Sequence, residues 1–91
     1  RDEYIAKIKL QLDELNASID AAEAKVHAAK ADVRDKYRAE VSKLQQQYRQ
    51  AVSKLDELKA AGEDTWESMV SEVEKVRDAL KHSYNYFKSQ L

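Results

Sequence analysis

The sequence contains no cysteine and no proline, and its 91 residues include only one glycine. Without cysteine, a disulfide framework and thiol chemistry are excluded. Proline and glycine are the residues on which tight turns depend, so a loop-rich globular fold is not expected. No apolar run approaches the roughly 18 residues of a membrane-spanning helix, and no signal peptide is visible. We therefore expect a cytoplasmic protein made of one domain, residues 1–91.

An excess of charge of either sign is also missing. The chain has 16 Lys and Arg against 17 Asp and Glu, a formal net charge of −1, and the two signs are interspersed. Proteins that bind nucleic acid usually gather their basic residues on one face or in one run. We therefore expect no nucleic-acid partner.

The residues that dominate the sequence are Ala, Glu, Lys, Leu, Gln and Arg, which lose little free energy on entering a helix. Charged residues alone make up 36% of the chain. This composition is typical of long helices and coiled coils, and it predicts an all-α fold.

Large apolar residues recur at alternating steps of three and four from Ile5 to Val33, which is the spacing of a heptad seam. Two steps of four follow between Val33 and Val41, as in a stutter that locally unwinds a coiled coil. The heptad spacing then resumes from Leu44 to Leu58. No strong helix breaker interrupts this region, so the pattern predicts one continuous helix, about 90 Å long at 1.5 Å per residue.

The only glycine, Gly62, marks the predicted end of that helix. It suits the left-handed residue that often follows a helix C-terminus. Asp64 or Thr65 then offers an N-cap oxygen, and Asp64 with Glu67 has the spacing of a capping box. The predicted elements are a helix over 2–61, a turn over 62–64, and a shorter antiparallel helix over 65–91.

The second helix is too short to cover the first in this arrangement. Its roughly 27 residues span about 40 Å, which leaves the seam from Ile5 to Val26 bare. Each aliphatic side chain left in water forfeits about 1.5–3 kcal/mol. We therefore expect an antiparallel homodimer with its two-fold axis near Ala31 and a three-helix bundle at each end. The predicted interface residues are Ile5, Ile8, Leu12, Leu15, Ile19, Val26, Val33, Leu44, Leu55 and Leu58.

A monomeric three-helix bundle is the main alternative. A bend near Lys30–Asp35 would divide the chain into near-equal thirds and make the same contacts within one chain. The dimer is then the domain-swapped form of this bundle. We favour the dimer because residues 27–38 contain no turn chemistry, while parallel dimers and higher oligomers stay open.

Candidate chemical sites are few. Glu23 with His27, and Asp78 with His82, place a carboxylate and an imidazole on one helix face, but a stable metal site usually needs three or four ligands. No catalytic triad and no glycine-rich phosphate loop is present, and thin bundles seldom form a water-excluding pocket. We expect no enzyme activity, no catalytic residue, no metal and no cofactor. Trp66, Tyr84 and Phe87 are expected in the bundle and Tyr86 in solvent.

Two functions remain, with metal or small-ligand sequestration as a third and weaker option. The first is a non-catalytic structural or protein-interaction module that oligomerises through its heptad seams, with a further protein as a second partner. The alternative is reversible binding of an amphipathic helix to a lipid or membrane surface. The narrow apolar stripe and the lack of excess basic charge make a membrane partner the less favoured expectation.

The whole chain resembles the small bacterial coiled-coil-domain proteins of unassigned activity. The resemblance is carried by the continuous seam, by Gly62 with the Asp64–Glu67 segment after it, and by the run of Val73, Val76 and Leu80. The helical pattern is also similar in general terms to apolipoprotein repeats. The resemblance implies a bacterial helical protein and offers no functional residues to transfer.

Overall fold

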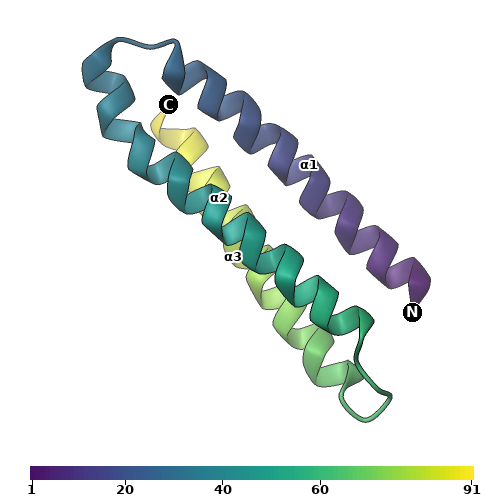
Figure 1. The fold of residues 1–91 in the computed structure, drawn as a ribbon. Coiled ribbons are helices and arrows are strands. Elements are labelled where there is room, and N and C mark those ends of the chain that lie inside the picture. The colour runs from purple at the N-terminus through teal and green to yellow at the C-terminus, as the bar shows by residue number, and fades with distance from the viewer.

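Three helices joined by two short connections account for nearly the whole chain in the computed structural model, which describes residues 1–91. Helix α1 spans Asp2–His27, α2 spans Ala31–Lys59 and α3 spans Trp66–Gln90. Consecutive helices run antiparallel and form an elongated bundle of 51 × 18 × 17 Å (Figure 1). The all-α fold class is confirmed.

The core of the bundle is formed by the heptad positions of all three helices. No polar or charged residue is buried in it. Burial of these side chains is the main favourable contribution to folding, because each removes apolar surface from water. The buried residues are Ile8, Leu12, Ile19, Ala22, Val26, Val41, Leu44, Ala51, Leu55, Leu58, Val73, Leu80 and Phe87.

The prediction of one continuous helix over 2–61 is wrong. Helix α1 ends at His27, the chain bends at Ala28–Lys30, and α2 begins at Ala31. Ala28 stays close to helical geometry (φ −82°, ψ −8°), whereas Lys30 is extended (φ −62°, ψ 154°). The reversal brings α1 against the other two helices of its own chain, and the apolar surface buried in this way offsets the lost helical hydrogen bonds.

The second connection lies where the sequence places it but is longer than the predicted turn over 62–64. Helix α2 ends at Lys59 and α3 begins at Trp66. Gly62 does not have a positive φ, so its predicted left-handed conformation is wrong. A connection of this length reverses the chain without any residue of positive φ.

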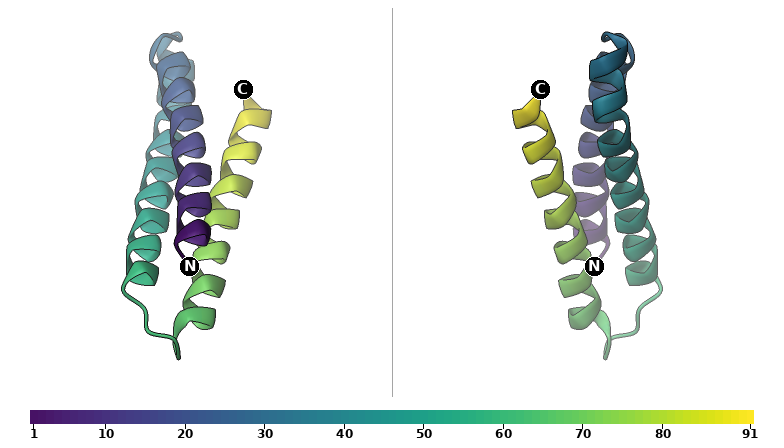
Figure 2. Two further views of the ribbon diagram at one scale, coloured as in Figure 1. Left: turned by 90° about the vertical axis from the view of Figure 1, so that its right-hand side faces the viewer. Right: turned by 90° about the vertical axis from the view of Figure 1, so that its left-hand side faces the viewer.

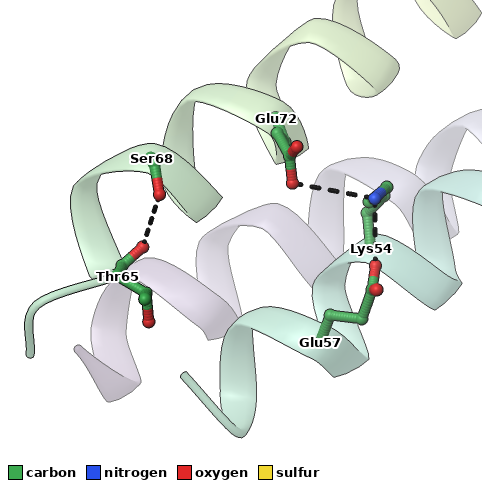
Figure 3. A network of polar contacts seen from close by, with 5 residues as sticks. All are labelled: Lys54, Glu57, Thr65, Ser68 and Glu72. Atoms are coloured by element: carbon green, nitrogen blue, oxygen red, sulfur yellow. Dashed lines mark hydrogen bonds and ion pairs between the residues drawn. The ribbon is translucent and has the colours of Figure 1, made fainter. Parts of the chain in front are cut away.

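The start of α3 also differs from the predicted capping box. Thr65 is the N-cap residue, and its side chain makes no capping hydrogen bond to the helix. Instead the Thr65 hydroxyl donates to the Gly62 carbonyl (3.3 Å), and the Ser68 hydroxyl donates to the Thr65 carbonyl (3.0 Å; Figure 3). Both hydroxyls therefore donate to carbonyls three residues earlier in the chain and leave the first N–H groups of α3 without a side-chain cap.

An ion-pair network links α2 to α3 on the bundle surface (Figure 3). Lys54 Nζ lies 3.2 Å from Glu57 Oε2 on its own helix and 3.6 Å from Glu72 Oε2 on α3. The hydrogen bond and charge of Glu57, with the charge of Glu72, raise the pKa of Lys54 above 10.5. Exposed pairs of this kind add little to stability, so the hydrophobic core dominates.

Two leucines of α1 test this account of the core. Leu12 is 1% exposed and Leu10 is 60% exposed. We expect Leu12→Ala to lower the free energy of unfolding by about 2–5 kcal/mol, because it leaves a cavity in the core. The matched control Leu10→Ala should stay within about 0.5 kcal/mol of the wild type. Urea denaturation followed by circular dichroism measures both, and equal losses would contradict the packing of α1.

Candidate functional site

Most of the predicted interface residues lie in the core of the single chain. Ile5 and Leu15 are partly buried, and Val33 remains 38% exposed. A second chain is therefore not needed to cover the α1 stripe, and the expectation that this stripe stays bare is wrong. The other seven are buried: Ile8, Leu12, Ile19, Val26, Leu44, Leu55 and Leu58.

The two ends of the bundle are built differently. At the end where α1 begins, the Arg1 guanidinium lies 4.2 Å from the centroid of the Trp66 ring and donates to the Gly62 carbonyl (3.2 Å). Tyr4 packs edge-on against the same Trp66 ring, with centroids 6.0 Å apart. These contacts join α1, the 60–65 connection and α3, so this end is closed.

At the other end α3 is attached to α2. The Tyr37 hydroxyl donates to the Gln90 carbonyl (2.8 Å), and the Tyr37 and Phe87 rings meet edge-on at 5.8 Å. Helix α3 diverges from α1 toward its C-terminus (Figure 2). A recess lined by residues of α1 and of the last turns of α3 lies at this end.

This recess is a groove of about 570 Å³, here called the α1–α3 groove. Its walls include the small side chains of Ala21 and Ala22 on α1 and of Ala29 in the bend, which fill little of the space between the helices. Phe87 and Leu91 line the α3 side, and Leu91 is 56% exposed. This mostly apolar recess thus lies beside the alanine-rich part of α1.

The two carboxylate–imidazole pairs singled out from the sequence do not gather further ligands. Glu23 accepts a hydrogen bond from the side-chain amide of Gln45 on α2, and Asp78 accepts one from Arg77 (3.0 Å). His27 and His82 are exposed on different helices. No group of three or more His, Asp or Glu side chains is placed to share a metal ion.

The aromatic residues lie as the seam predicts. Phe87 is buried, Trp66 and Tyr84 pack against the core, and Tyr86 is 64% exposed. Tyr37 stands at a seam position, so its packing against the core is expected. Its hydrogen bond to Gln90 depends on how far α3 extends along α2, and no sequence pattern indicates this.

None of the three helices combines the length and the apolar character that crossing a membrane requires. Comparison with protein-family models, with curated proteins and with solved structures finds no match to this chain.

Tyr4 gives a pH-dependent test of the closed end. Its hydroxyl oxygen is buried and has no hydrogen-bond partner. Burial raises the pKa of Tyr4 above 10.0, and the nearby Glu74 carboxylate raises it further. The folded state therefore holds the hydroxyl proton of Tyr4 more tightly than the unfolded state does. Its contribution to the free energy of unfolding is fully present below pH 10 and is lost as the pH rises through the folded-state pKa.

We therefore expect Tyr4→Phe to leave the free energy of unfolding at pH 7 unchanged or slightly higher, since it removes a buried hydroxyl without a partner. Between about pH 9 and 11 the variant should lose less stability than the wild type. Urea titrations at each pH measure this, with the exposed Tyr86→Phe as control. If the wild type and Tyr4→Phe lost the same free energy of unfolding over this pH range, the raised pKa of Tyr4 would not be its cause.

Proposed function

We propose that this chain is a non-catalytic protein-interaction module that self-associates by opening the bend at Ala28–Lys30 and exchanging α1 with a second copy. Two residues of the bend support this proposal. Ala28 is already near helical geometry and Lys30 has a helical φ, so that of these two residues only Lys30 has to change its ψ to join α1 to α2. The steps from Val26 to Ala29 to Val33 keep the heptad phase, so a straightened helix would present one continuous seam.

The exchange would conserve most of the packing energy. In a C2 dimer, α1 of each copy would lie against α2 and α3 of the other and bury the same core residues. Straightening would also restore helical hydrogen bonds at a helix start that lacks a side-chain cap, since Lys30 makes no capping bond. The entropy cost of association opposes the exchange, so it should depend on protein concentration.

The same proposal places the protein in the cytoplasm, without a cofactor or a nucleic-acid partner, and with a further protein as a second partner. The interspersed charges support the absence of a nucleic-acid partner, because the basic residues are not gathered in one run. Binding to a membrane surface would need a continuous exposed apolar face. Of the exposed large apolar residues, Leu10 and Tyr86 lie apart on α1 and α3, and only Val33 and Leu91 share a recess.

A proline at position 30 separates the bent chain from the straight one. The φ of Lys30 (−62°) suits proline, and its N–H donates no backbone hydrogen bond. Within a continuous helix the same proline costs about 3 kcal/mol. We expect Lys30→Pro to keep the helicity and melting temperature of the dilute wild type while weakening dimerisation by about 100-fold or more.

Sedimentation equilibrium across a dilution series measures the effect. The wild type should shift from monomer to dimer mass as its concentration rises, and Lys30→Pro should remain monomeric over the same range. Lys30→Ala is the matched control, because it removes the same charge without restricting the backbone, and it should follow the wild type. A wild type that stays monomeric throughout, or a Lys30→Pro variant that dimerises equally well, would refute self-association by this route.

A further inference from the structure

The α1–α3 groove combines apolar walls with a cationic rim. Eight of its eleven lining residues are apolar, and its only charged side chains are Lys25 on α1 and Lys88 on α3. Neither lysine takes part in an ion pair. No acidic side chain lines the groove, although acidic residues slightly outnumber basic ones in the chain as a whole.

A purely structural role accounts for part of this. Lys25 and Lys88 each lie in the last turn of their helix, where a cation stabilises the negative end of the helix dipole. That role explains each charge separately. It does not explain why both border the same apolar recess, in which Val33 and Leu91 remain 38% and 56% exposed. A concave, mostly apolar lining with a few polar groups at its edge is the usual form of a small-molecule site.

We propose that the α1–α3 groove binds a single-chain amphiphile with an anionic headgroup, such as a medium-chain fatty acid. The hydrocarbon tail would lie against Ala21, Ala22 and Phe87, and the carboxylate would be held by Lys25 and Lys88. The volume of about 570 Å³ falls within the range of small-molecule sites, roughly 300–1,000 Å³. The two lysine ammonium groups favour an anionic headgroup over a cationic one, against the partial negative charge of the helix ends that they border.

The site stands on the geometry of the single bundle and does not depend on the proposed exchange of α1. Helix α3 is held to α2 through Tyr37 and Gln90, while the alanines of α1 leave room beside it. A leucine at an alanine position in the wall would occupy that room. Ala21 suits this substitution because it is exposed, lies within a helix and lines the groove.

Isothermal titration calorimetry with decanoate, kept below its critical micelle concentration, tests the site. We expect one decanoate per chain, unchanged helicity at saturation, and binding up to about four-fold tighter for each methylene added between octanoate and decanoate. Decyltrimethylammonium, which has the same tail and the opposite charge, should bind at least ten-fold more weakly. The Lys30→Pro variant should bind decanoate like the wild type, so failure of the dimer and failure of the site are distinguishable.

Two pairs of variants locate the binding. The double variant Lys25→Gln/Lys88→Gln should weaken decanoate binding at least ten-fold, whereas Lys9→Gln/Lys75→Gln removes the same charge outside the groove and should change nothing. Ala21→Leu should weaken binding by filling the groove, and Ala24→Leu, on the same helix but outside it, should not.

Four results would overturn the proposal. They are equal affinity for the anionic and cationic amphiphiles, no effect of the Lys25/Lys88 double variant, heat only above the critical micelle concentration, and binding to anionic liposomes without binding to monomeric decanoate. If decanoate binding is lost when the protein reaches the dimer mass, a second copy of the chain covers the groove. This result too would refute the amphiphile site.

Discussion

The apolar stripe of α1 has to lie against other apolar side chains, because several of its members would otherwise each leave about 1.5–3 kcal/mol of burial energy unrealised. The place at which the chain first reverses decides which molecule supplies those side chains. With the reversal at Ala28–Lys30, α2 and α3 of the same chain cover Ile8, Leu12 and Ile19. The length, shape and open end of the bundle all follow from that reversal.

The alanines near the end of α1 precede the bend and also line the α1–α3 groove. Small side chains such as Ala21 and Ala22 bury little area and hold neighbouring helices weakly, so α3 can lean away from α1 there. Tyr37 keeps the last turn of α3 against α2 through its bond to Gln90. At the opposite end Arg1 and Trp66 tie the start of α1 to the rest of the bundle. The molecule is thus fixed at one end and open at the other.

The sequence was a good guide to whatever depends on periodicity. The heptad spacing identified the helical content and the buried faces, including Leu44, Leu55 and Leu58, which were expected in a dimer interface and lie in the core of one chain, and the only glycine marked the boundary near Gly62. These features depend on local propensity and on the alternation of apolar and polar faces, and both can be read from residue types.

The bend was not decided in the same way: a reversal near Lys30–Asp35 belongs to the alternative three-helix bundle, while the seam favours an unbroken helix, and the chain reverses at Ala28–Lys30. Lys30 adopts φ and ψ values open to any L-residue, so no glycine or proline had to mark it. Breaking the helix there depends on the balance between lost helical hydrogen bonds and apolar area gained elsewhere in the fold. The α1–α3 groove was missed for a related reason, since it depends on how α3 inclines. Gly62 was assigned a left-handed conformation because the turn was expected to be shorter than it is.

An intramolecular distance between the start of α1 and the 60–65 connection tests the reversal most directly. The chain has no cysteine, so Asp2→Cys and Glu63→Cys together provide two unique labelling sites. Spin labels at these positions, at a total protein concentration at which sedimentation gives the monomer mass, should give one short distance, because Arg1 hydrogen-bonds to Gly62 in the bundle. A distance of roughly 90 Å, the length of an unbroken helix over the same residues, would contradict the account.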